Sequence, residues 1–234
     1  MTKHVLDNPA WHALHGPHAR FAESVGNAVR YHPDVAPFLT VHPEAGPEVW
    51  PDVAALAGPG AVIAVTGDAP APPPSWEVVE NAGGVQLLDV SVDARPDPEA
   101  VVLGAADVPE ILDLVARTKP GPYRQRTIEL GTYLGIRREG RLVALAGERL
   151  HLDGWTEISA VCTDAAFRGQ GLATRLVRAV AHGIRARGER PLLHAAATNT
   201  GAIRLYESIG FELRRRTTFR VVRVPAPELA EATA

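Results

Sequence analysis

A glycine-bearing turn at residues 168–173, Arg-Gly-Gln-Gly-Leu-Ala, is the stretch of this sequence best suited to binding a ligand. Residues 157–163 before it are apolar and β-branched, which predicts a buried strand. After it, apolar residues recur every four positions from Leu172 to Ile184, which predicts an amphipathic helix. A strand, a tight turn and a helix N-terminus together present free backbone N–H groups at the positive end of the helix dipole. The predicted ligand is an anion, most naturally a phosphate.

The two glycines of this turn, Gly169 and Gly171, have a conformational reason to be there. Without a Cβ they can take positive φ and let a ligand approach the backbone. The turn matches neither of two other phosphate motifs, because no Lys-Ser or Lys-Thr follows it and its spacing is not G-x-G-x-x-G. By itself, the turn could equally be an ordinary strand-to-helix loop.

A second stretch, residues 199–211, supplies the context that the turn lacks. Together the two stretches resemble the GCN5-related N-acetyltransferases. Residues 168–173 fit the family signature [QR]-x-x-G-x-[GA], and residues 199–211 fit Asn-x-x-Ala-x-x-Leu-Tyr-x-x-x-Gly-Phe. The resemblance covers about residues 100–224 and is greatest to the FR47-like branch, which includes glycine N-acyltransferase-like enzymes.

This resemblance implies both a fold and a reaction. The fold is α/β (α+β), with a mixed, mostly antiparallel sheet flanked by helices. The reaction is direct transfer of an acetyl group from acetyl-CoA to a primary amine of a small-molecule or amino-acid-like acceptor, without a metal. The residues implied to bind coenzyme A are Val161, Cys162, Thr163, Arg168, Gly169, Gln170, Gly171, Leu172, Ala173, Thr174, Asn199, Ala202 and Tyr206. Val161 and Thr163 would act through backbone groups, and Asn199 could also cap the helix that follows it.

Transfer of an acetyl group from a thioester to an amine needs a donor to the oxyanion, an acid for the departing thiolate and a base for the amine. The resemblance assigns the acid to Tyr206, whose phenol has an ordinary pKa of about 10. The alternative is that Tyr206 packs between helix and sheet with its hydroxyl satisfied locally.

Two residues compete for the base. Glu157 lies on the predicted strand before the turn, with the parity of Val161 and Thr163, and His194 lies on the next predicted strand. The alternatives are a solvated edge glutamate and a hydrogen-bonded core histidine. The resemblance favours Glu157 slightly, because family members often place a carboxylate on this strand.

Other reactive residues are assigned structural roles. Cys162 has the opposite parity to Glu157 and apolar neighbours that would raise its pKa, which predicts a small core residue. His12, His15 and His18 are separated by Gly16-Pro17 and joined by no cysteine or acidic cluster, so we expect solvated loop residues and not a metal site.

Composition limits the class of protein. The chain has 234 residues, a net charge of −3 and one cysteine, which excludes an intramolecular disulfide framework. Residues 1–99 carry 13 acids against 4 bases, whereas residues 165–224 carry 12 arginines against 3 acids. The asymmetry suggests an anionic ligand for the C-terminal part. With no signal peptide and no apolar run of about 18 residues, we expect a cytoplasmic protein, monomeric or homodimeric, with no membrane or nucleic-acid partner.

The predicted organisation is an N-terminal region at 1–98, an acetyltransferase domain at 99–225 and a flexible tail at 226–234. The N-terminal region could be a degenerate acetyltransferase-like half, as glycine N-acyltransferase-like proteins carry. It is predicted to contain a short helix within 19–30, and the C-terminal residues 212–224 are predicted to form a hairpin.

The acceptor is the least defined part of the prediction. Family members shape this site with the loop after the first helix, here residues 119–126. Its basic residues and Tyr123 would suit an acceptor with a carboxylate, although a solvated basic loop explains them equally well. The alternative to an enzyme is a non-catalytic acyl-CoA-binding or sensing module; nucleic-acid binding through the arginines is a more distant alternative.

Overall fold

The strands of this chain join in one sheet of 11 strands, seen here in a computed structural model that describes residues 4–226. The strand order is β1-β2-β3-β4-β11-β5-β10-β9-β8-β7-β6. Two neighbouring pairs, β3–β4 and β9–β10, are parallel. The other described pairs are antiparallel, so the sheet is mixed and mostly antiparallel, as predicted.

Between residues 100 and 210 the predicted elements all form. They are β6 (Val101–Leu103), α3 (Val108–Thr118), β7 (Tyr133–Arg138), β8 (Arg141–Leu152), β9 (Trp155–Thr163), α4 (Leu172–Ala186), β10 (Arg190–Ala196) and α5 (Thr200–Ser208). The apolar stripe of α4 and the side chains of α5 pack on one face of the sheet, and the apolar residues of α3 pack in a separate cluster with Tyr133 and Leu145.

The predicted C-terminal hairpin is wrong, because residues Phe211–Arg223 form the single long strand β11. The apparent break in its pattern is a β-bulge between Leu213 and Arg215, not a turn. Arg214, the extra residue, donates to Gln86 Oε1 at 2.8 Å and to Asp7 Oδ1 at 2.8 Å.

The N-terminal region is also built mainly of strands. Its elements are α1 (Pro9–Leu14), β1 (Ala22–Val25), β2 (Ala28–Tyr31), β3 (Phe38–Val41), α2 (Trp50–Ala57), β4 (Val62–Thr66) and β5 (Glu77–Asp89). The helix predicted within 19–30 is wrong, because β1 and β2 form a hairpin there. Gly26 takes φ of 51° at the hairpin turn, a conformation that a helix does not contain.

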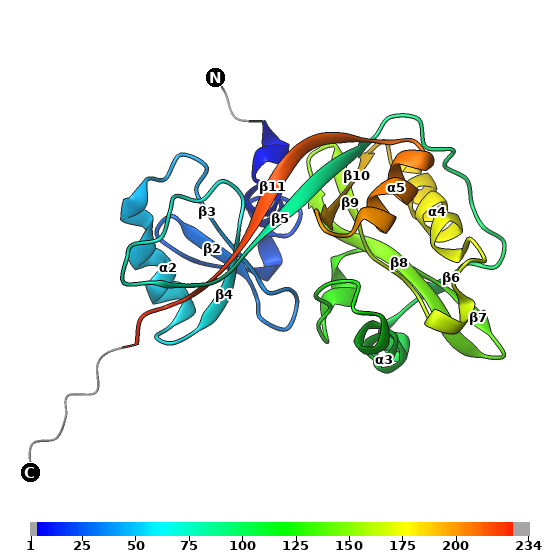
Figure 1. Ribbon diagram of the computed structural model, residues 1–234, viewed down its shortest axis with the longest axis horizontal. Helices are drawn as coiled ribbons and strands as arrows, with labels where there is room; N and C mark the ends of the chain where they lie inside the picture. Colours follow the sequence, from blue (N-terminus) through cyan, green and yellow to red (C-terminus); the bar gives the residue numbers. More distant parts are fainter. Residues whose placement is uncertain (1–3, 227–234) are drawn as a thin grey trace, which may run out of the picture.

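The two halves of the chain repeat one order of elements. In both, two antiparallel strands lead to a third, and a helix then crosses over to a parallel fourth strand: β1-β2-β3-α2-β4 and β7-β8-β9-α4-β10. The fifth strand of each half pairs with the fourth strand of the other half. Strand β5, which follows β4, pairs with β10, and β11, which follows β10 and α5, pairs with β4. Figure 1 shows β5 and β11 running side by side between the two halves. The boundary predicted at residue 98 falls between β5 and β6, and the division into two domains remains a prediction.

Ion pairs between the halves account for much of the uneven charge. Arginines of α4 and β11 pair with acids of residues 1–99, so their charge is compensated within the chain. The pairs are Arg175–Asp97, Arg185–Asp89, Arg214–Asp7, Arg215–Asp68 and Arg223–Glu77. The predicted tail lies outside the described residues from position 227 onward. None of the helices within residues 4–226 has the length and hydropathy that a membrane crossing requires.

Candidate active site

A cleft opens where two parallel strands separate. The ladder between β9 and β10 ends at the pair Ile158–Leu193. Beyond it, β9 continues to Thr163 along β8, and β10 continues to Ala196 along β5. The cleft of about 810 Å³ is lined by both strand ends and reaches the start of α4 and the N-terminal half. Because β10 no longer pairs with this part of β9, the β9 backbone can bind a ligand there.

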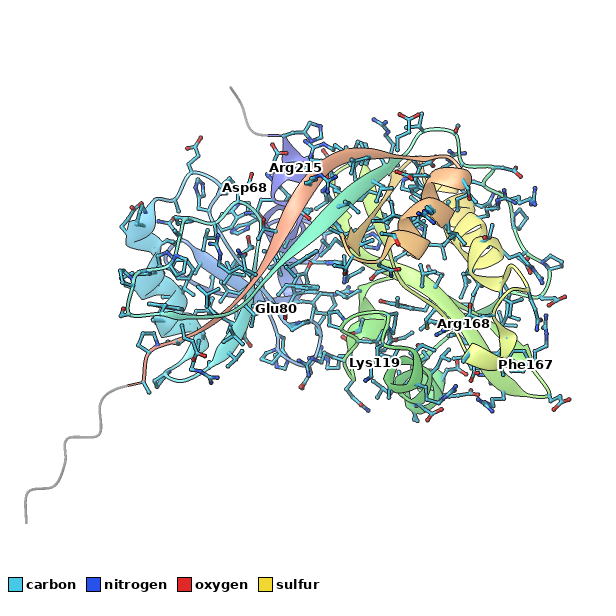
Figure 2. The ribbon with its side chains drawn as sticks, in the orientation of Figure 1. Asp68, Glu80, Lys119, Phe167, Arg168 and Arg215 are labelled. Carbon is cyan, nitrogen blue, oxygen red and sulfur yellow. The ribbon has the colours of Figure 1, made fainter. Side chains whose placement is uncertain are left out.

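The glycine turn lies at the mouth of this cleft. Gly169 and Gly171 take φ of 79° and 73°, and a Cβ on either would meet nothing within 4 Å. Helix α4 begins at Leu172 with no side-chain cap and no acid in its first turn, so its N-terminal N–H groups are available to an anion. Figure 2 shows Arg168 beside the start of α4.

The implied coenzyme A residues divide into those that line the cleft and those that only border it. Val161, Cys162, Thr163, Arg168, Ala173, Asn199, Ala202 and Tyr206 line the cleft. Gly169, Gln170, Gly171 and Thr174 belong to the turn and to the first turn of the helix. The Leu172 side chain is buried in the core under α4, so Leu172 can contribute only its backbone.

A β-bulge in β9 changes which face of the sheet its last residues point to, so the prediction from simple alternation fails there. The register shifts between Leu145 and Gly147 of β8, and Ala160 opposite them takes φ of 54°. Alternation is therefore broken at Ala160: Val161 packs toward the α4 cluster, while Cys162 packs in the α3 cluster. Cys162 thus shares the face of Glu157, contrary to the parity prediction. Burial raises the pKa of the Cys162 thiol to about 11, which keeps it protonated at neutral pH.

Tyr206 lies on α5 with its side chain in the cleft wall. It is 7% exposed, and burial raises the pKa of its phenol to about 12. Within residues 4–226 its hydroxyl has no hydrogen-bond partner, unlike the locally satisfied hydroxyl of the alternative interpretation. Asn199 caps α5 by accepting from Ala202 N–H at 3.2 Å and also lines the cleft, so both of its predicted roles are geometrically open.

Glu157 and His194, the two candidates for the base, contact each other directly. His194 Nδ1 lies 2.7 Å from Glu157 Oε1, and Arg149 binds both carboxylate oxygens of Glu157 at 2.8 and 2.6 Å. Burial by itself would raise the pKa of Glu157, but Arg149 and His194 bring it down to about 2. The fully buried Glu157 does not line the cleft, whereas His194 and Arg149 do.

Gln86 fixes the tautomer of neutral His194. Its amide oxygen accepts from Arg214, and its nitrogen donates to Leu6 O at 2.9 Å, which sets the orientation of the amide. The same nitrogen lies 2.9 Å from His194 Nε2 and must donate to it. Neutral His194 therefore carries its proton on Nδ1 and donates it to Glu157.

Sequence reasoning missed Arg149 and Gln86 as members of this network. Arg149 did leave a signal, because a charged residue in the apolar run of β8 requires a buried partner. Gln86 left none, since a single glutamine in a strand is equally common as a surface residue.

The first half of the predicted acceptor loop lines the cleft, with Lys119, Pro120, Gly121 and Pro122, whereas residues 123–126 do not. Lys119 lines the cleft and forms no ion pair within residues 4–226; Figure 2 shows it on the loop after α3. Tyr123 is buried in the α3 cluster, and Arg126 is paired with Glu129. The N-terminal half also lines the cleft, with Pro37, Phe38 and Ala64.

The three N-terminal histidines differ from one another. His12 is half-buried on α1, so its predicted place in a solvated loop is wrong. His15 is exposed just after this helix and stacks on Trp11, with ring centroids 3.9 Å apart. His18 is 4% exposed and lies 2.9 Å from the Tyr31 hydroxyl, so its predicted place in a solvated loop is wrong. Across residues 4–226, three or more His, Cys, Asp or Glu side chains nowhere gather in a way that could hold a metal ion.

Comparisons with known proteins agree with this architecture. The FR47-like protein family matches residues 133–221. The crystal structure of a GNAT acetyltransferase family protein from Novosphingobium aromaticivorans DSM 12444 is 42% identical, with 94% of this chain and 98% of that chain covered and a TM-score of 0.86. No curated protein matches the chain.

Two more distant structures share the fold. A GCN5-related N-acetyltransferase from Kribbella flavida is 18% identical, with 94% of this chain and 96% of that chain covered and a TM-score of 0.64. A GCN5-related N-acetyltransferase-like protein from Streptococcus suis 89/1591 is 17% identical, with 92% of each chain covered and a TM-score of 0.53. The strand separation, the glycine turn and the near full-length similarity at 42% identity converge on one conclusion: the chain belongs to the GCN5-related N-acetyltransferase (GNAT) family, whose members transfer acyl groups.

Proposed function

We infer that the protein is an acetyl-CoA-dependent N-acetyltransferase acting on a primary amine. The observation that supports it best is the cleft that joins the glycine turn to Tyr206 between the separated ends of β9 and β10. Uncapped amides at one end suit a diphosphate, and the edge of β9 that β10 leaves unpaired beyond Ile158 suits an extended amide-bearing arm.

In this proposal Tyr206 protonates the departing thiolate. The thioester supplies the activated acetyl group, and the chain supplies the proton and its position. A phenol with its pKa raised to about 12 is protonated at neutral pH, and a hydroxyl without a protein partner is free to donate.

His194 is the member of the charged network that meets the amine, because it lines the cleft and Glu157 does not. A proton accepted at His194 Nε2 replaces the hydrogen bond from Gln86. The resulting imidazolium is stabilised by Glu157, which holds Nδ1–H and remains ionised because Arg149 keeps its pKa low. Glu157 therefore acts as a positioning residue for His194, and the amine must enter as its neutral form or lose its proton here.

Two measurements test this function. Calorimetric titration of the whole protein with acetyl-CoA is expected to show saturable binding at one site. Release of free thiol in the presence of a panel of primary amines is expected to show turnover. Saturable binding without turnover on any amine would instead favour an acyl-CoA-sensing module, and no binding would contradict both.

A further inference from the structure

The wall of the cleft carries charge of only one sign. None of the described residues that line it is Asp or Glu, whereas three of them are basic: Lys119, Arg149 and Arg168. Arg168 stands at the turn, where the family binds coenzyme A. Lys119 and Arg149 therefore set the charge of the remaining part, which the acceptor would occupy.

Of these two cations, only Lys119 is uncompensated. Arg149 is paired with Glu157, and its guanidinium lies 4.9 Å above the centre of the Phe38 ring. An acceptor with a second ammonium group would therefore meet a positive lysine in the cleft, and like charges repel. Carboxylates do line a smaller pocket of about 50 Å³ that shares Phe38 and Phe219 with the cleft, but each is paired with an arginine: Glu157 with Arg149, Asp7 with Arg214 and Asp68 with Arg215.

Beside the polar Thr118, Ser159 and His194, several other residues that line the cleft are apolar. Phe38 and Ala64 are cross-strand neighbours on β3 and β4, and Pro37 and Phe219 lie in the same wall. Pro120 and Pro122, on the loop after α3, line the same cleft. The side chains of phenylalanine and proline offer no hydrogen bond to a polar ligand, so a hydrocarbon chain or ring is the group that gains by burial against them.

The Phe219 ring occupies space in this wall that the lack of a side chain at Gly84 leaves open. Gly84 lies on β5 opposite Thr217, and a Cβ on Gly84 would collide with the Phe219 ring and the Thr217 hydroxyl. The ring packs directly on the Gly84 backbone, and any larger residue at position 84 must displace it.

We propose that the acceptor is a monoamine with an apolar body, an alkyl chain or an aromatic ring, bound between Phe38 and Phe219, and that the site rejects polyamines and other acceptors with a second positive charge. This inference rests on the proposed N-acetyltransferase function and specifies its substrate class. Residues of the N-terminal half, Phe38 and Ala64, then contribute to substrate selection.

The test compares amines that differ in one feature. Hexylamine and 1,6-diaminohexane share one chain and differ by a second ammonium, and 2-phenylethylamine replaces the chain with a ring. In the thiol-release assay with the whole protein, we expect kcat/KM for the two monoamines to exceed that for the diamine at least ten-fold. Equal or better use of the diamine would overturn the inference while leaving the acetyltransferase function standing. Acetyl-CoA binding with no turnover on any of the three would overturn both.

Variants link this preference to the named residues. Lys119→Glu is expected to narrow the gap between hexylamine and the diamine by at least five-fold. Phe219→Ala and Gly84→Ala are expected to raise KM for both monoamines five-fold or more, with KM for acetyl-CoA unchanged within two-fold. Val221→Ala is the matched control: it is half-buried on the same strand, two residues away and outside the cleft wall, and should change neither. Equal effects of Phe219→Ala and Val221→Ala would contradict the assignment of Phe219.

Discussion

The two crossover units of the sheet, β3-α2-β4 and β9-α4-β10, share a topology but present different helix N-termini. In each, a strand leads through a short connection into a helix that returns to a parallel strand. Both helices therefore direct the positive end of their dipole toward the strand end. The cleft is lined by Arg168 and Ala173 at the start of α4, whereas none of its lining residues belongs to α2.

The difference lies in the residues at the two helix starts. At α2, the Trp50 N–H donates to Pro47 O, and Asp52 places an acid in the first turn. Pro51 has no N–H to offer. At α4, two glycines replace the prolines, and the first turn carries no acid. A crossover helix thus provides the dipole, and the residues of the turn decide whether an anion can use it.

The second unit also carries a helix that the first lacks. Helix α5 joins β10 to β11 and bears Tyr206, whereas residues 67–76 join β4 to β5 with a proline-rich connection that contains no helix. In the proposed mechanism Tyr206 supplies an acid that the first unit does not have. Removal of its hydroxyl should therefore remove this acid with little effect on the fold.

The largest effect is expected from Tyr206→Phe. Loss of a positioned acid should lower kcat about 10²–10⁴-fold. KM for acetyl-CoA and the free energy of unfolding should stay nearly constant, because the hydroxyl has no partner within the described residues. Steady-state thiol release and urea unfolding measure both. A variant with unchanged kcat would show that Tyr206 is a packing residue.

Loss of one buried polar group should destabilise the protein more in the charged network of Glu157 than in the neutral network of Thr40. Glu157→Gln leaves Arg149 as a buried unpaired charge, and we expect the free energy of unfolding to fall by about 3–5 kcal/mol. Thr40→Val is the counterpart in β3, where the hydroxyl bonds to Asn8 Oδ1 at 2.8 Å in a neutral network. Its cost should be about 1–3 kcal/mol. The double variant Arg149→Leu/Glu157→Leu should recover much of the loss, since no unpaired charge remains; equal costs for the two single variants would contradict the contrast.

Acid should unfold the protein in two stages, one from each half. Burial and the nearby His151 lower the pKa of His18 to about 4 from 6.5. The unfolded chain takes up this proton first, so stability falls as pH drops from 6.5 to 4, by about 3 kcal/mol. Glu157, with its pKa lowered to about 2 from 4.5, contributes stability that is complete above pH 4.5. This contribution, also about 3 kcal/mol, is lost as pH falls toward 2. Unfolding free energies from pH 8 to 2 test both stages, and His18→Asn should remove only the first.

Sequence reasoning succeeded where the site depends on backbone and local pattern. The turn at 168–173 needs only glycines between a strand and a helix, and α4 needs only its apolar period; both are local properties. It failed where partners are distant in sequence. The bulge at Ala160 reversed the facing of Val161 and Cys162, and a one-residue shift of register leaves no trace in composition. The network of His194 with Gln86 joins residues 108 positions apart, through pairing of β5 with β10 that no local signal predicts.

A smaller effect is expected where backbone freedom alone is removed. Gly171→Ala forces an L-residue into φ of 73° and places a Cβ in the open space above the turn. We expect a loss of about 1–2 kcal/mol in stability and about ten-fold weaker binding of acetyl-CoA. Gly183→Ala, inside α4 and with no neighbour for its Cβ, should stabilise the protein by about 0.5–1 kcal/mol and leave binding unchanged. Unchanged binding in both variants would remove the turn from the site.

The smallest effect on the fold is expected from giving α4 the acid that α2 already has. Thr174→Glu places a carboxylate in the first turn, as Asp52 does in α2. An acid at this end interacts favourably with the helix dipole, so we expect a gain of about 0.3–1 kcal/mol in stability. The same charge would repel a diphosphate, so binding of acetyl-CoA should weaken by about five- to ten-fold at low salt and recover as salt is added. Thr174→Gln has the same shape without the charge and should bind normally. If the two variants weaken binding equally, the cause is steric, and the lack of an acid in the first turn of α4 would not explain binding of acetyl-CoA there.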